Sequence, residues 1–162
     1  MITGSAPISK DVLNFLKIAF CCPIVEWYGQ TECSAPGSIT WIKDPNAGHV
    51  GAPFPALEFK LVDVPDMNYF STAVDENGQP QPKGEVCYRG TNTFKGYFAN
   101  PVGTKETIDS EGWVHTGDIG LFKTDGTLKI IDRKKNIFKL SQGEYLIPEK
   151  IENKLVQSIY IQ

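Results

Sequence analysis

The stretch EGWVHTGDIGLFKTDGTLKIIDRKKNIFK, residues 111–139, combines turn signals, alternating strand residues and a basic run. Its Asp125-Gly126 pair predicts the turn of a β-hairpin. Closure there brings the Thr116-Gly117-Asp118 turn and the basic run to the same side of the hairpin. Asp118 can then accept hydrogen bonds from hydroxyls, and Arg133 can donate a fork of N–H groups. The stretch therefore predicts a binding site for a sugar or a nucleotide.

Length and composition indicate a globular protein of one domain, or of one domain and the start of another. The chain has 162 residues, of which 41% are hydrophobic and 22% charged, values that exclude disordered, collagen-like and coiled-coil classes. The net charge of −3 argues against a nucleic-acid partner or an anionic membrane surface, because no basic excess is present to hold phosphates.

The cysteines are spaced unlike the ligands of a zinc finger. The chain has four, with a vicinal pair at Cys21-Cys22 and single residues at Cys33 and Cys87, and none forms a CxxC motif. We expect reduced thiols that serve as small buried hydrophobic residues in an intracellular, cytoplasmic protein. No apolar run is long enough to span a bilayer, so any membrane association, for example with the endoplasmic reticulum, is expected to be peripheral and through regions outside this chain.

The amino-terminal third predicts an α/β unit. The small-residue turn Gly4-Ser5-Ala6-Pro7 precedes Ser9, which is placed to cap a helix. The expected apolar face of this helix follows i, i+3, i+4, i+7 spacing and consists of Val12, Phe15, Leu16 and Ala19. Pro23 then leads into a predicted buried strand, residues 24–28, that ends at Gly29.

Gln30-Thr31-Glu32 follows this strand, at the carboxyl end where open α/β sheets commonly place ligands. A hydroxyl at Thr31 and a carboxylate at Glu32 suit a phosphate with its Mg²⁺. A plain turn with a solvated glutamate is the alternative.

From residue 38 onward the sequence predicts a β-rich part. Strands are expected at 39–42, 57–62, 85–89, 121–122, 128–131 and 137–140, with helices at 101–108 and from Pro148 onward. The fold class is therefore α/β in the broad sense, or α+β. The charged run Asp132–Lys135 marks the expected domain boundary, which separates residues 1–132 from 133–162.

Four ordered motifs resemble those of the adenylate-forming, or AMP-binding, superfamily. They are Tyr28-Gly29-Gln30-Thr31-Glu32, Gly84-Glu85-Val86-Cys87-Tyr88-Arg89-Gly90, Gly112-Trp113 with Thr116-Gly117-Asp118, and Asp132-Arg133-Lys134-Lys135. Further segments resemble the long-chain acyl-CoA synthetases in particular: Val50-Gly51-Ala52-Pro53, the segment from Lys60 to Pro65, the segment from Leu140 to Tyr145, and the segment from Pro148 to Glu152.

This resemblance implies the end of a large AMP-binding domain with a β-rich subdomain, followed by the start of a small carboxyl-terminal domain. The implied activity is ATP-dependent, AMP-forming ligation of a long-chain fatty acid to coenzyme A. A fatty acid carboxylate attacks the α-phosphate of ATP and pyrophosphate leaves. The coenzyme A thiolate then displaces AMP from the acyl-adenylate. The implied cofactors and partners are ATP or AMP, Mg²⁺, the fatty acid and coenzyme A.

The resemblance also implies roles for individual residues. Tyr28 and Gly29 would contact adenine, and Thr31 and Glu32 would act on the phosphate as catalytic residues, with Glu32 also holding the metal. Asp118 and Arg133 would bind the ribose.

Three further positions carry implied roles. Gly4-Ser5-Ala6 would form the wall between adenine and the acyl chain. Lys135 would be the hinge of the small domain, and Lys139 would face the active site during thioester formation; a solvated strand residue is the alternative for Lys139.

Two departures qualify these expectations. Trp27 stands where the family usually has glycine, so it would crowd the base or offer another stacking face. The phosphate loop and the catalytic lysine of the family would lie outside residues 1–162, so the isolated chain is expected to be inactive. The alternatives are a synthetase for another carboxylic acid, a non-catalytic module with part of a nucleotide site or a truncated product that does not fold alone, and a β-rich binding domain whose motifs coincide by chance.

Overall fold

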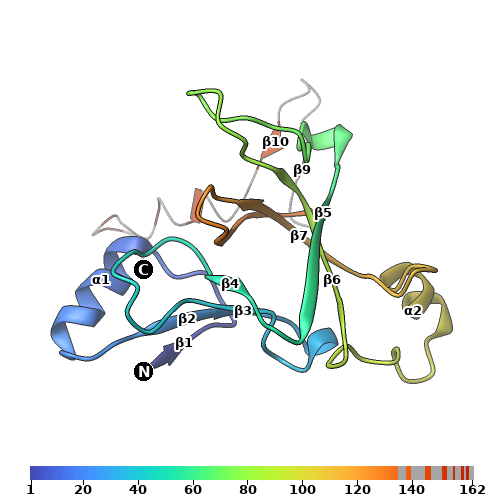
Figure 1. The fold of residues 1–162 in the computed structure, drawn as a ribbon, viewed down its shortest axis with the longest axis horizontal. Helices are drawn as coiled ribbons and strands as arrows, with labels where there is room; N and C mark the ends of the chain where they lie inside the picture. The colour runs from blue at the N-terminus through green and yellow to red at the C-terminus, as the bar shows by residue number, and fades with distance from the viewer. Residues whose placement is uncertain are drawn as a thin grey trace.

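The computed structural model describes residues 1–134, 138–139, 145–146, 151–152, 155, 158 and 160. It is a mixed α/β fold in which two four-stranded sheets and a two-stranded ribbon combine with few helices (Figure 1). The elements of the first sheet and its helices are β1 (Ile2–Thr3), α1 (Lys10–Ala19), β2 (Val25–Tyr28), the 3₁₀ turn η1 (Thr31–Cys33), β3 (Ser38–Ile39) and β4 (Ala52–Pro53). The later elements are β5 (Leu57–Val62), η2 (Pro65–Met67), β6 (Lys83–Gly90), α2 (Pro101–Thr107), β7 (Val114–Phe122), β8 (Leu128–Arg133), β9 (Phe138–Lys139) and β10 (Tyr145–Leu146).

The amino-terminal unit is a β-α-β arrangement, which confirms the predicted α/β character. β1 pairs in parallel with β2, with Thr3 opposite Glu26, and α1 connects them beside the sheet (Figure 1). Ser9 caps α1 as predicted, because its Oγ accepts from the backbone N of Val12 at 3.2 Å. The sequence did not predict β1, since two residues are too few to show a period.

The predicted apolar face of α1 is wrong in detail. Leu13 is the buried residue, at 2% exposure, whereas Val12 and Phe15 are 49% and 66% exposed and Ala19 is also exposed. Leu16 is half-buried. Periodicity identifies an apolar stripe but not which edge of it meets a neighbour, and in the described part of the chain α1 packs through Leu13.

The second sheet is an antiparallel meander, β5-β6-β7-β8, seen as the long strands of Figure 1. Its residues form most of the core: Val86, Tyr88, Val114, Ile119 and Leu128 are at most 1% exposed. Two backbone bonds join this sheet to the segment before β4, from Val50 N to Leu128 O and from Leu128 N to Gly51 O. The two sheets are thereby fixed against each other.

β7 runs without a break through the segment predicted to be a turn. The Thr116-Gly117-Asp118 turn is thus a correction: it is a bulge inside a strand, where Gly117 has φ +71°. Glu85 pairs with Ile119 and Cys87 with His115, so β7 carries extra residues opposite β6. A bulge of this kind changes the direction of a side chain without ending the strand. Here the side chain concerned is that of Asp118.

The predicted hairpin turn is confirmed. The backbone N of Gly126 donates to Lys123 O at 2.9 Å, and Gly126 has φ +80°. Asp125 Oδ1 accepts from the N and Oγ1 of Thr127 at 2.9 and 2.6 Å, and these bonds lower the pKa of Asp125. A register shift between Ile119 and Gly120 then brings Asp118 opposite Arg133, so the two ends of the hairpin meet as expected.

The other predicted elements match in type and differ in length. β5 has the predicted bounds, β6 extends beyond them, and α2 begins with Pro101 behind the cap Asn100. β3 stops at Ile39, and Trp41 is exposed. β9 lies within the predicted strand 137–140.

The carboxyl-terminal helix and the hinge residue are described only in part. Ile151, Glu152 and Leu155 are helical, and the rest of the helix predicted from Pro148 lies outside the described residues. Lys135 lies outside them too. No helix in the described ranges has the length and apolar character needed to cross a bilayer.

The cysteines are free, but they are not uniformly buried as expected. Cys33 and Cys87 are buried, whereas Cys21 is exposed and Cys22 is half-buried. The exposed position follows the end of α1, where Cys21 Sγ donates to Ile18 O at 3.3 Å.

Candidate functional site

Asp118 is the centre of a polar network that joins both sheets. Its Oδ2 accepts from Tyr28 Oη at 2.8 Å and from Gln30 Nε2 at 2.7 Å, and its Oδ1 lies 3.2 Å from Arg133 Nε. Asp118 is only 7% exposed, while the Arg133 side chain is 54% exposed. The structure therefore brings together three predicted site residues, Tyr28, Asp118 and Arg133, although Tyr28 is 90 positions from Asp118 in the chain.

Gln30 has a positioning role that the sequence did not reveal. Its Nε2 also donates to Thr116 O at 3.1 Å, and its Oε1 accepts from Tyr88 Oη at 3.4 Å. The side chain thus ties the bulge of β7 to the segment after β2. Its place in the motif was the one available signal, because nothing local in the sequence predicts a partner so distant.

Tyr28 remains a hydrogen-bond donor to Asp118. Burial, followed by the nearby Asp118 carboxylate, raises the pKa of Tyr28 well above its ordinary value. Its hydroxyl group therefore keeps its proton and donates a hydrogen bond to the Asp118 carboxylate. A deprotonated tyrosine would instead repel that carboxylate.

Thr31 and Glu32 lie on η1, directly after β2. Thr31 is exposed, and Glu32 is half-buried, with Oε1 accepting from Tyr97 Oη at 2.5 Å. The backbone of the same residue is also held, since Phe94 N donates to Glu32 O at 2.8 Å. The bond to Glu32 raises the pKa of Tyr97. Tyr97 therefore orients the carboxylate, a role that the sequence did not predict.

Two glycines let backbone and rings approach closely near Tyr28. A Cβ at Gly29 would lie 1.5 Å from Ala35 O, and a Cβ at Gly4 would lie 1.6 Å from Trp27 Cδ1. The indole of Trp27 therefore lies against Gly4, at the carboxyl ends of the parallel strands β1 and β2. The predicted wall Gly4-Ser5-Ala6 lies at this edge, with Ser5 at φ +74°.

The remaining predicted residues are less fully described. Lys139 lies in β9, where its backbone pairs with Tyr145. Lys135, the predicted hinge, is among the residues the structure does not describe. Their roles stay predictions.

A second polar cluster lies beneath the bulge of β7. Glu85, 6% exposed, accepts from Gly117 N at 3.1 Å through Oε1, and its Oε2 lies 3.4 Å from both His115 Nδ1 and Lys134 Nζ. Cys87 Sγ lies 3.4 Å from the same His115 nitrogen. Burial, followed by the charge of Glu85, raises the pKa of Cys87 to about 12. Sequence spacing could not reveal this cluster, because its members meet only across paired strands.

Glu26 on β2 is a buried carboxyl group, and we predict that it makes stability depend on pH. Glu26 is 8% exposed, its Oε2 has no hydrogen-bond partner among the described residues, and burial raises its pKa from 4.5 to about 7. Between these values the native state binds more protons than the unfolded state, so the free energy of unfolding falls as pH rises, by on the order of 2–3 kcal/mol.

Glu26→Gln should therefore raise the free energy of unfolding at pH 8 and flatten this dependence. Urea unfolding at pH 5 and pH 8 measures it. The control is Glu76→Gln in an exposed loop, which should leave the pH dependence unchanged. An unaltered pH profile in Glu26→Gln would contradict the prediction.

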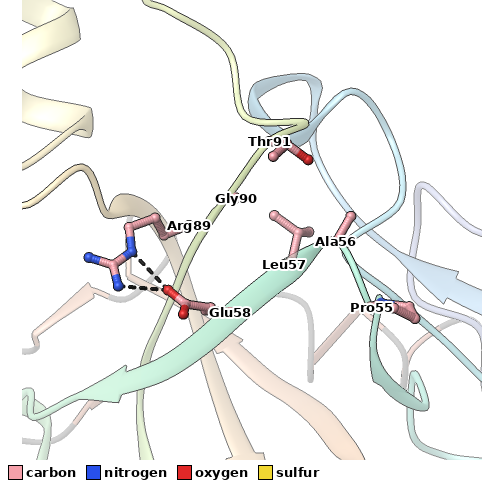
Figure 2. A pocket seen from close by; sticks show the side chains of 7 residues that line it. All are labelled: Pro55, Ala56, Leu57, Glu58, Arg89, Gly90 and Thr91. Atoms are coloured by element: carbon pink, nitrogen blue, oxygen red, sulfur yellow. Dashed lines mark hydrogen bonds and ion pairs between the residues drawn. The ribbon is translucent and has the colours of Figure 1, made fainter.

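A shallow hollow lies apart from this network, between β5 and β6. Figure 2 shows Glu58 and Arg89 side by side among its lining residues, with Arg89 Nε and Nη2 donating to Glu58 Oε2 at 2.9 and 2.7 Å. Arg89 also lies over the ring of Trp113, with Cζ 4.5 Å from the centroid, and Lys60 Nζ lies 4.4 Å from it. No predicted site residue lines the hollow, so it is not the candidate site.

The side chains of this site fit a nucleotide and its metal. Asp118, on β7, offers a buried carboxylate that Tyr28, Gln30 and Arg133 already hold in place, which suits ribose hydroxyls. The exposed Thr31 hydroxyl and the Glu32 carboxylate suit a phosphate and Mg²⁺, since Mg²⁺ is commonly bound by one or two carboxylates together with substrate phosphate oxygens.

Known proteins resemble this chain in sequence and in structure. Residues 1–98 match the family model described as AMP-binding enzyme. Fatty acyl-CoA synthetase A of Dictyostelium discoideum is 53% identical over 98% of this chain, and long chain acyl-CoA synthetase 7, peroxisomal, of Arabidopsis thaliana is 56% identical over 94%. The chain spans 23% and 21% of these relatives, about a fifth of their length.

A solved structure agrees with the sequence relatives. The adenylation domain of carboxylic acid reductase from Segniliparus rugosus, in complex with AMP and a co-purified carboxylic acid, aligns with a TM-score of 0.74 and 33% identity, covering 93% of this chain and 22% of that one. The chain therefore belongs to the AMP-binding enzyme family.

Proposed function

We propose that the chain supplies the ribose-binding and adenine-binding part of an ATP-dependent, AMP-forming long-chain fatty acid–CoA ligase. The observation that carries this proposal is the Asp118 network, in which Tyr28, Gln30 and Arg133 converge on one buried carboxylate. The similarity to acyl-CoA synthetases supports the substrate class.

In this proposal each residue has a physical task at the nucleotide. Asp118 accepts from the ribose hydroxyls, and Arg133 exchanges part of its contact with Asp118 for the same sugar. The ring of Tyr28 packs on adenine, where Gly29 lets the backbone approach. Thr31 donates to the α-phosphate, whose negative charge grows during acyl transfer.

Glu32 would hold Mg²⁺, which supplies charge neutralisation at the phosphates when bound. Tyr97 keeps the Glu32 carboxylate in place by donating to Oε1. Gly4-Ser5-Ala6 would separate the adenine from the acyl chain, with Trp27 closing this wall from the side of Gly4.

The domain organisation extends the proposal. We place the end of the large domain at Asp132 and the start of the small domain at Arg133, where β8 ends. Lys135 would be the hinge between adenylation and thioester formation, because hinges commonly lie at the ends of elements. Lys139 would face the site in the thioester-forming orientation, in which coenzyme A enters.

The proposed partners are a fatty acid, ATP and coenzyme A. An intracellular location is supported by relatives such as the peroxisomal synthetase of Arabidopsis thaliana. Contact with an organelle membrane would be peripheral.

ATP–pyrophosphate exchange by the protein in its full reading frame tests the function. Exchange should depend on a long-chain fatty acid, and Glu32→Gln should reduce it by about 100-fold or more, because a metal-binding carboxylate is lost. Glu76→Gln, in an exposed loop, is the matched control and should retain full exchange. Exchange supported only by aryl or amino acids would contradict the acyl-chain assignment.

A second candidate is a synthetase for another carboxylic acid, and the similarity to the adenylation domain of a carboxylic acid reductase favours it over a non-enzymatic role. A panel of carboxylic acids in the same exchange assay separates the two enzymes. A non-catalytic nucleotide-binding module would instead bind AMP in calorimetry without supporting exchange.

A further inference from the structure

The cluster beneath the bulge of β7 has the ligand types of a metal site. A carboxylate oxygen of Glu85, the Sγ of Cys87 and a ring nitrogen of His115 lie within 4.8 Å of one another. They come from two adjacent strands, with Cys87 directly opposite His115 in the register of β6 and β7. Carboxylate, thiolate and imidazole together suit a borderline divalent ion of the zinc class.

Two of the three distances between the ligand atoms match tetrahedral coordination. His115 Nδ1 lies 3.4 Å from Cys87 Sγ and 3.4 Å from Glu85 Oε2. Ligand atoms about 2.0–2.3 Å from a tetrahedral zinc lie about 3.3–3.6 Å from each other. Both contacts of the imidazole are therefore at the spacing of ligands that share an ion, and the third pair of ligand atoms lies within 4.8 Å.

The surroundings of His115 also fit a metal ligand. Its other ring nitrogen, Nε2, lies 3.4 Å from Asp109 Oδ2, as in sites where a carboxylate fixes the tautomer of a ligating histidine. Glu85 is held as well, because its Oε1 accepts from Gly117 N. The cluster is thus oriented by a second layer of bonds.

The structure shows from which side an ion can reach the cluster and which side chain competes with it. Cys87 is fully buried and the Glu85 side chain is 7% exposed, but the His115 side chain is 28% exposed, so an ion would reach the cluster from the side of the imidazole. Lys134 Nζ lies 3.4 Å from Glu85 Oε2, with its side chain 50% exposed. The ion would replace this ammonium group, which can move into solvent.

We propose that Glu85, Cys87 and His115 form a three-ligand site for one zinc-class ion, distinct from the Mg²⁺ site proposed at Glu32. On binding, the Cys87 Sγ–H bond breaks, its proton passes to the buffer, and the sulfur pair bonds the metal. Because Glu85 also holds Gly117, the ion would fasten β6 to the bulge that presents Asp118.

Cobalt titration of the 162-residue chain tests this site. The titration uses a Cys21→Ser, Cys22→Ser background, because the exposed vicinal pair is the obvious competing thiol site. One equivalent of Co²⁺ should produce a near-ultraviolet thiolate-to-cobalt band, and Zn²⁺ should displace it. Circular dichroism of each variant confirms that it is folded.

The variants separate the ligands from their surroundings. Cys87→Ser should abolish the thiolate band, and His115→Gln should weaken Co²⁺ binding by more than tenfold. Asp109→Asn should weaken it by about tenfold, as loss of the partner of a ligating histidine commonly does. Lys134→Gln should tighten binding severalfold, because a competing cation is removed.

Cys33→Ser, which removes the other buried thiol, is the control and should leave the band unchanged. A band that survives Cys87→Ser, or the absence of any thiolate band at saturating Co²⁺, would overturn the proposal. If Cys87→Ser does not fold, unchanged affinity in folded His115→Gln would overturn it equally.

Discussion

Asp118→Ala is expected to lower the affinity for AMP by about 100-fold, with a smaller effect on stability. A charged acceptor that binds the two ribose hydroxyls contributes about 3 kcal/mol in total, since each hydrogen bond to a charged group is worth about 1.5–3 kcal/mol. The substitution also removes the partner of Arg133, but that side chain is 54% exposed and can be solvated. Calorimetric titration with AMP and a thermal melt measure the two effects side by side.

A control at the other end of the same hairpin separates binding from stability. Asp125→Ala removes the two bonds to Thr127 that stabilise the turn, so it should lower the melting temperature and leave the AMP affinity unchanged. Asp118→Asn keeps the shape of the side chain without its charge and should weaken AMP binding by about tenfold. Equal losses of stability and affinity in Asp118→Ala would favour a purely structural role for this carboxylate.

Gly29→Ala is expected to lower the free energy of unfolding by about 3 kcal/mol or more. The new Cβ would lie 1.5 Å from Ala35 O and 2.7 Å from Ala35 C, and these are backbone atoms that no rotamer change can move aside. The segment that must shift includes η1, which carries Thr31 and Glu32. Urea unfolding measures the stability, and AMP titration at low temperature reports on the site.

Gly78→Ala is the matched control for this clash. Gly78 has φ +75° and open space around it, so an added methyl group there costs only the strain of a left-handed backbone, about 1–2 kcal/mol. If Gly29→Ala lowers the free energy of unfolding no more than Gly78→Ala does, the loop around Ala35 moves aside at little cost and the prediction is wrong.

Local sequence signals predicted much of the second sheet. The turn residues Asp125-Gly126 and the alternating strands beside them were sufficient to bring Asp118 and Arg133 to the same end of the hairpin. Their direct pairing depends on a bulge beside Ile119, which shifts the register that the turn sets. Gly117 was misread as the centre of a turn. Glycine at positive φ is common to turns and bulges, and only the strand opposite distinguishes them.

Local sequence patterns could not predict the interactions between distant segments. Neighbours far along the chain decide which edge of α1 packs. They also decide the contact of Trp27 with Gly4 and the bond from Tyr97 to Glu32. The same is true of Glu85, Cys87 and His115, whose spacing matches no metal motif although their ligand atoms are close.

The sequence by itself determined the mixed α/β class, the hairpin with Asp118 and Arg133 at its open end, and the ordered motifs of the AMP-binding family, since each of these follows from residues close together in the chain. Only the tertiary structure decided that Tyr28 and Gln30 complete the Asp118 network and that a second cluster lies beneath the same bulge. The physical reason is that strand pairing brings together side chains up to 90 positions apart, and the burial and register that fix such contacts are properties of the packed sheets rather than of any local segment.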